Sequence, residues 1–183
     1  MTLFRMGLLR GLMLGCTVAL LPSGIRAEDS DAQLLSRLPK SKHTVQEALE
    51  AVHASGGVPI SAKLEFEDGK LWLSAYGAKA GLDKCAEKNE LFELKGDATT
   101  EKWQPEREVF QDKEHLTRAS AQLTLMQTTQ LTLDAAVAKA DALKKGSVYS
   151  AIPMLKDGKT AINVRIRTTN GQGTTIVIDG KAQ

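Results

Sequence analysis

Residues 131–179 read LTLDAAVAKADALKKGSVYSAIPMLKDGKTAINVRIRTTNGQGTTIVID, and this stretch predicts a helix followed by antiparallel strands. Thr132 is a suitable N-cap, because its hydroxyl can accept from a backbone N–H that the first helical turn leaves open. Gly146 follows the helical pattern and favours its end. The apolar residues at helical spacing are Leu133, Ala136, Val137 and Ala140.

The strands after this helix are predicted by alternation. Residues 148–155 lead to Asp157-Gly158-Lys159, and Ile162, Val164 and Ile166 then alternate with polar residues. Asp-Gly between two alternating segments is a strong hairpin signal, since glycine accepts the positive φ of a tight turn. Residues 170–173 form a second predicted turn, and residues 174–178 form a last strand.

Residues 43–76 carry the same order of signals. Thr44 and Glu47 fit a capping box, and Gly56-Gly57 follow the helix. Two alternating segments flank Asp68-Gly69-Lys70. Because each helix stripe and each sheet face must be buried, the helix should lie across its strands. The sequence therefore predicts an α+β protein of two tandem α-β-β-β units, each a helix on a three-stranded antiparallel sheet.

These residues also resemble a known family. The segment from Leu131 to Ala140, Gly146, the Asp157-Gly158-Lys159 hairpin and the strand ending at Lys181 resemble a PepSY domain. Residues 43–76 resemble it more weakly, and the likeness covers about half to two-thirds of the chain. The resemblance implies a bacterial protein that is secreted or attached to a membrane, and a link to restraining peptidases or to binding in the cell envelope. The motifs behind this resemblance are structural, so the resemblance assigns no catalytic residue to this sequence.

Between the two units the sequence predicts an irregular tail and a connecting helix. We assign residues 43–111 to the first unit, with a third strand near Leu91–Leu94 and no regular structure over 98–111. Asp112 can cap a bridging helix within residues 112–130, and residues 131–183 form the second unit. The predicted apolar stripe of the bridging helix is Leu116, Ala119, Leu123 and Met126.

The N-terminus has the features of an export signal. Arg5 and Arg10 precede an apolar segment that is too short to span a bilayer, and Ala27 suits the cleavage position. We therefore assign residues 1–27 to a signal peptide and residues 28–42 to a polar leader or a short helix. A periplasmic or secreted protein is favoured over a lipoprotein, which would be attached to the membrane through Cys16.

The charge of the exported chain gives no reason to expect nucleic acid as a partner. Without Arg5, Arg10 and Arg26 the chain has 21 basic and 22 acidic residues. Residues 131–183 are net basic and residues 28–130 net acidic. Two readings stay open, namely ordinary solvated surfaces or an acidic partner for a face that contains Arg165 and Arg167.

The residues that could carry chemistry do not form a recognisable motif. Cys85 would remain as a lone cysteine, and a thiol enzyme would need a nearby histidine from His43, His53 or His115. The histidine spacings match no zinc pattern, so neither a metal nor a cofactor is predicted. Glu65 and Glu67 alternate with apolar residues and are expected to face water.

The expected function is binding rather than catalysis. Trp72 and Tyr76 fall on the strand face opposite Leu71 and Leu73, where they could contact a protein or peptide. Trp103 and Phe110 could instead cover that face. We expect a non-enzymatic envelope module, with a peptidase or another envelope protein as its partner and with Trp72, Tyr76, Arg165 and Arg167 as candidate contact residues. The alternatives are a thiol enzyme using Cys85, and a module that senses a small ligand or a metal.

Overall fold

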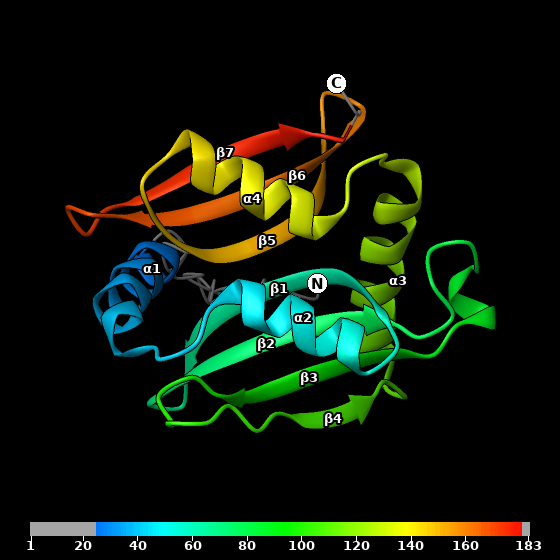
Figure 1. The fold of residues 1–183 in the computed structure, drawn as a ribbon, viewed down its shortest axis with the longest axis horizontal. Coiled ribbons are helices and arrows are strands. Elements are labelled where there is room, and N and C mark those ends of the chain that lie inside the picture. The colour runs from blue at the N-terminus through cyan, green and yellow to red at the C-terminus, as the bar shows by residue number, and fades with distance from the viewer. Residues whose placement is uncertain (1–24, 181–183) are drawn as a thin grey trace, which may run out of the picture.

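The computed structural model describes residues 25–180, with side chains from Asp31 onward. These residues form one antiparallel sheet with the strand order β4-β3-β2-β1-β5-β6-β7 and helices on its faces (Figure 1). The helical elements are α1 (Ile25–Arg37), η1 (Leu38–Lys40), α2 (Val45–Ala54), η2 (Ala86–Lys88), α3 (Lys113–Thr128) and α4 (Leu133–Leu143). The strands are β1 (Val58–Glu67), β2 (Lys70–Ala78), β3 (Leu91–Asp97), β4 (Glu106–Val109), β5 (Gly146–Lys156), β6 (Lys159–Thr168) and β7 (Gly173–Asp179).

The α+β class and the order of elements are confirmed. A helix precedes three antiparallel strands in each half, as α2-β1-β2-β3 and as α4-β5-β6-β7. The two sets of strands do not form separate sheets, however. β1 pairs with β5 at Ala62–Ala151 and Lys63–Ser150, which makes one sheet of both halves. This pairing gives hydrogen-bond partners to strand edges that would otherwise be left open.

The helix starts and hairpins follow the sequence signals. Thr44 and Glu47 form the capping box of α2, and Thr132 accepts from the Ala135 N–H at the start of α4. Asp112 caps α3 in the same way. Both hairpins contain Asp-Gly with positive φ at both residues, 51° and 78° at Asp68-Gly69 and 51° and 73° at Asp157-Gly158. That is the turn whose twist matches paired strands.

One prediction about the tail of the first unit was wrong. Residues 98–111 were expected to be irregular, but Glu106–Val109 form β4 and pair with β3 from Phe92–Val109 to Lys95–Glu106. A strand of four residues with three charged side chains has no clear apolar alternation. β4 forms because the tertiary fold places the outer edge of β3 beside this segment, and no pattern within the segment itself predicts a strand.

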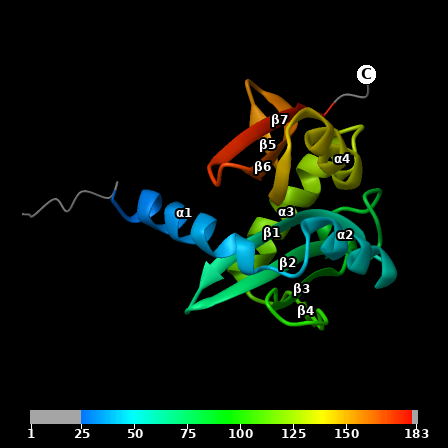
Figure 2. The same cartoon turned by 60° about the vertical axis from the view of Figure 1, so that its left-hand side comes forward.

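The helices divide unequally between the two sheet faces. α2 and α4 lie side by side on one face, where Leu49, Leu73 and Ile162 are fully buried (Figures 1 and 2). α3 lies against the opposite face, and its Gln122 accepts a hydrogen bond of 2.7 Å from Ser61 on β1. The predicted stripe of α3 was partly wrong, because Leu116 is exposed. Ala119, Leu123 and Met126 make the buried surface that bridges β1 and β5.

The N-terminal helix α1 lies at the end of the sheet away from α3 and extends outward from it (Figures 1 and 2). α1 occupies most of the expected leader and begins at Ile25, so the expected cleavage position at Ala27 falls in its first turn. The rest of the expected signal peptide, including Cys16, lies outside the described residues. Within residues 25–180, none of the helices has the length and apolar character needed to cross a bilayer.

We predict that Gly77→Ala destabilises the fold. A Cβ atom on Gly77 would lie 2.5 Å from Cζ of Phe92 and 2.8 Å from Cγ1 of Val52, and both side chains are fully buried. Overpacking of this kind costs about 1–3 kcal/mol in the free energy of unfolding. Urea unfolding measures the loss. Thr175→Ala, at an exposed position of β7, is the control and should change stability by less than about 0.5 kcal/mol. Equal stability of the two variants would contradict the packing of β2 against α2.

Candidate binding site

The sheet face opposite α2 and α4 carries a row of polar side chains from one edge to the other. Cross-strand register places one residue from every strand in a continuous row, which runs Glu106, Lys95, Ser74, Lys63, Ser150, Arg165 and Thr175. Directly opposed side chains in such a row are neighbours and interact. α3 contacts β1 and β5, and the face over β2, β3 and β4 contains a cleft.

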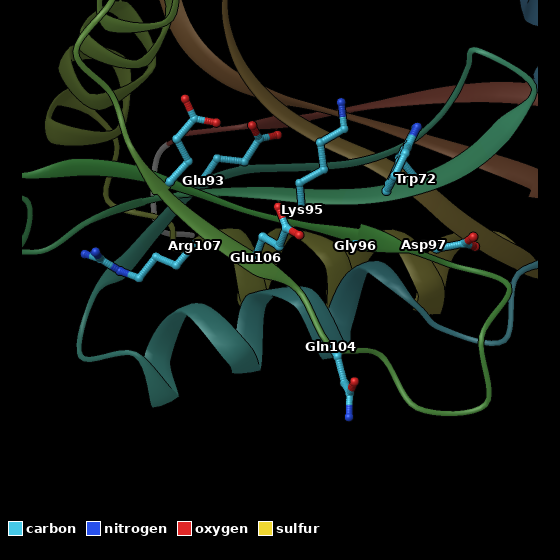
Figure 3. A pocket seen from close by; sticks show the side chains of 9 residues that line it. Trp72, Glu93, Lys95, Gly96, Asp97, Gln104, Glu106 and Arg107 are labelled. Carbon is cyan, nitrogen blue, oxygen red and sulfur yellow. The ribbon is translucent and has the colours of Figure 1, made fainter.

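The cleft has a volume of about 550 Å³. Trp72, Glu93 and Lys95 project to the same side of the sheet, and Arg107 projects away from them (Figure 3). The residues that line the cleft are Trp72, Glu93, Lys95, Gly96, Asp97, Gln104, Glu106, Arg107 and Glu108. Alternation along β3 and β4 accounts for this arrangement, since every second side chain reaches the same face.

Trp72 supplies the apolar surface of the cleft. Its indole ring is half-buried between Lys70 and Lys95, with each ammonium nitrogen 5.4 Å from the ring centroid. Cations at this distance are attracted to the negative face of an aromatic ring. The ring is therefore held in place, and a fixed aromatic surface binds a partner at little entropic cost.

Lys95 is neutralised by residues of β1. Its ammonium nitrogen lies 3.1 Å from Oε2 of Glu67 and 3.7 Å from Oε1 of Glu65. Burial alone would lower the pKa of Lys95, but the hydrogen bond that it donates to Glu67 and the charges of Glu65, Glu67 and Glu93 outweigh burial and raise the pKa above its usual value. Lys95 therefore stays charged, and its charge is already balanced.

Glu93 is the buried carboxylate of the cleft. Only 8% of the residue is exposed, and its Oε1 accepts a hydrogen bond from Ser74 on β2. Among residues 31–180, no side chain or backbone group donates to its second oxygen, Oε2. Oε2 is not one of the buried atoms without a partner, so it is open to the cleft and can accept a charge-assisted hydrogen bond from a donor that enters.

The cleft has an excess of negative charge. Arg107 packs its guanidinium over the Phe92 ring at 4.2 Å and binds Glu90 at 2.5 Å, on the other side of β4. Within the described part of the chain, Glu93, Glu106 and Glu108 form no ion pair. These three carboxylates therefore form no ion pair among the described residues, and the nearby Lys95 is bound by Glu65 and Glu67, so the site is complementary to a cationic ligand.

The four contact residues predicted from the sequence are not gathered at one site. Trp72 lies in the cleft, but Tyr76 is 4% exposed and packs edge-on against Phe110 with ring centroids 4.8 Å apart. Tyr76 is therefore not an exposed contact residue, because the segment before α3 folds onto it, as the alternative prediction for this face expected. Phe110 thus covers part of the face.

Arg165 and Arg167 lie in the second half of the sheet and bind α1. Arg165 forms an ion pair of 2.5 Å with Asp31, and Nε of Arg167 donates to the Leu35 carbonyl at 3.1 Å. Their partners are therefore within the chain. The basic face was open to two readings, and in this structure it holds the N-terminal helix against the sheet.

Cys85 and the three histidines occupy separate environments. Cys85 is exposed. The ring nitrogens of His43, His53 and His115 have partners of their own, at Thr100 and Glu47, at Asp134, and at Asp112. Over the range that the structure describes, no group of three or more histidine, cysteine or acidic side chains is arranged to hold a metal ion.

Sequence reasoning did not single out Glu93, Glu106 or Glu108. Glu93 interrupts the apolar segment Leu91–Leu94, and a charged residue at an inward position of a strand is an available signal. Its meaning depends on Ser74, which lies on another strand. Glu106 and Glu108 enter the site only because β4 pairs with β3.

No protein-family model matches the chain, and no curated protein matches it. Among solved structures, the chain is similar to the crystal structure of a “putative lipoprotein” from Clostridium difficile 630. The two are 19% identical, the match covers 77% of this chain and 88% of the other, and the TM-score is 0.37.

The two tyrosines of the chain give a pH prediction. Burial, and then the charge of Glu93, raises the pKa of Tyr76, while burial and Asp31 raise that of Tyr149. Above the ordinary phenol pKa of about 10, the unfolded chain loses these protons before the folded chain does. The free energy of unfolding is therefore unaffected below that pH and should fall as the pH rises through the raised pKa values.

Ultraviolet titration of phenolate, combined with urea unfolding at mildly and strongly alkaline pH, measures this effect. Tyr76→Phe should reduce the alkaline loss of stability, because one of the two protons that the folded chain retains is removed. Titration of both phenols at the pKa of free tyrosine in the folded chain would contradict the burial of Tyr76.

Proposed function

We propose that this protein is a non-enzymatic, PepSY-like binding module of the bacterial cell envelope. Its partner is an envelope protein or a peptide segment of one, and a peptidase that is restrained by surface occlusion is the partner class that the family resemblance implies. The export signal in residues 1–27 supports the compartment. The helix-then-strands order in both halves supports the resemblance and a duplicated origin.

The observation that carries the binding role is the open cleft beside an edge strand. It combines a fixed aromatic ring at Trp72 with carboxylates that have no cation, at Glu93, Glu106 and Glu108. Their negative charge is complementary to a cationic partner, and the ring adds apolar contact area. A catalytic site would instead need a nucleophile or an acid–base pair held in contact, and Cys85 has no such histidine among its described hydrogen-bonding neighbours.

The proposal predicts a partner that depends on Trp72. The chain without residues 1–27, immobilised and exposed to the solubilised envelope fraction of its source cell, should retain one consistent protein. Trp72→Ala should weaken this binding about tenfold or more, because buried aromatic contacts are the usual hot spots of interfaces. Competition between wild type and variant, read by quantitative mass spectrometry, measures the loss.

Two variants serve as controls for this experiment. Thr175→Ala changes the same sheet face at the far edge and should leave capture unchanged. Cys85→Ser tests the thiol-enzyme alternative and should also leave capture unchanged. The proposal fails if no consistent envelope protein is retained, or if capture is lost in Cys85→Ser and kept in Trp72→Ala.

A further inference from the structure

We propose that the site binds an extended, cationic segment of its partner, which adds to the free edge of β4 as an eighth strand and places lysine or arginine side chains opposite Glu106 and Glu108. This inference rests on the proposed binding function and specifies its ligand.

The backbone of β4 has one open side. β4 is the first strand of the sheet and pairs only with β3. The N–H of Phe110, just beyond β4, donates to the Leu91 carbonyl at 3.0 Å. Because hydrogen-bonded and non-hydrogen-bonded positions alternate along an antiparallel pair, the amide groups of Glu108 and Glu106 face β3 and those of Arg107 and Val109 face outward. These outward groups are available to an added strand.

The side chains of β4 decide which strand is favoured. Glu106 and Glu108 face the cleft, in register with Lys95 and Glu93 of β3. In an added antiparallel strand, the residues opposite them would occupy non-hydrogen-bonded positions, where side chains approach most closely. A basic residue there forms a favourable cross-strand pair, whereas an acidic residue is repelled and an apolar one leaves the carboxylates desolvated.

Glu93 provides a further carboxylate behind Glu108. A long basic side chain on the added strand can reach it, whereas a short one cannot. Glu93 lies one strand further in than Glu108, and paired strands are about 4.8 Å apart. A lysine or arginine that extends over β4 approaches Oε2 of Glu93, the carboxylate oxygen that Ser74 leaves open to the cleft. A charge-assisted hydrogen bond at that atom adds to the pair at the edge.

The opposite edge of the sheet does not offer the same chemistry. β7 carries Thr175 and Val177 on this face, in register with Arg165 and Asn163. Asp179 lies on the same face at the end of β7, opposite Ala161, so an added strand there would meet a single carboxylate and, at Thr175, a hydroxyl beside Arg165, whereas β4 offers two carboxylates. β7 therefore serves as an internal control, since peptide binding should change the signals of β4 and not those of β7.

A synthetic peptide tests the inference directly. The probe is a capped heptapeptide with the sequence Thr-Lys-Val-Lys-Val-Lys-Thr, titrated into the ¹⁵N-labelled chain without residues 1–27. We expect saturable binding, with amide shifts and slowed hydrogen exchange at Arg107 and Val109 and no change at β7. The peptide with glutamate in place of lysine should not bind.

Two double variants and a modified peptide separate the effect of charge from the effect of strand addition. Glu106→Gln with Glu108→Gln should weaken binding about threefold to tenfold, the range expected for two cross-strand pairs. Glu106→Lys with Glu108→Lys should reverse the preference, so that the glutamate peptide binds and the lysine peptide does not. A lysine peptide N-methylated at the amides that face β4 should lose binding, whereas methylation of the other amides should not. Circular dichroism and urea unfolding show that each variant is folded.

Several results would overturn the inference. They are equal binding of the lysine and glutamate peptides, no binding of either, shifts centred on β7, or binding that is unaffected by N-methylation. The proposed function is judged separately. A captured envelope partner that ignores the charge reversal at β4 refutes the cationic strand and leaves the binding role standing, whereas peptide binding without any captured partner refutes the envelope role.

Discussion

The structure depends on a short stretch of backbone pairing between β1 and β5. Two residue pairs, Ala62–Ala151 and Lys63–Ser150, join the halves of the chain into one sheet. The pairing turns two small units, each with a single helix to cover its strands, into one body with a shared core. It also sets α2 beside α4, where His53 reaches Asp134 at 3.1 Å. A pairing this short needs support, and α3 provides it by contacting both strands.

The same constraint produces the asymmetry of the two sheet faces. α2 and α4 cover one face with apolar contacts, and the opposite face receives α3 at one end and the partners of Arg165 and Arg167 at the other. The face over β2, β3 and β4 keeps charged side chains because the helices bury the alternate residues of the same strands. The joining of β1 to β5 also decides that β4 and β7 are the edges. The candidate site is therefore a consequence of how the halves meet, and it combines an edge strand with carboxylates that the fold leaves without cations.

Local sequence signals predicted most helices and strands. The features that they missed depend on contacts between segments that are far apart in the chain. The helix caps and hairpin turns depend on neighbours within a few residues, so local sequence predicts them. They are the caps at Thr44 and Thr132 and the turns at Gly69 and Gly158. Trp72 was placed correctly on the face opposite Leu71, because alternation alone decides it. Tyr76 obeys the same alternation yet is buried, since Phe110 arrives from a distant segment. β4, the hydrogen bond from Ser74 to Glu93 and the union of β1 with β5 likewise require strands that are far apart in the chain.

The most direct measurement is a nuclear Overhauser experiment on the backbone protons of residues 62–63 and 150–151 in the chain without residues 1–27. We expect interstrand contacts between Ala62 and Ala151 and between Lys63 and Ser150, with both halves tumbling as one body. Absence of these contacts, together with different rotational correlation times for the two halves, would show separate sheets and contradict the single-sheet structure on which the site at β4 depends.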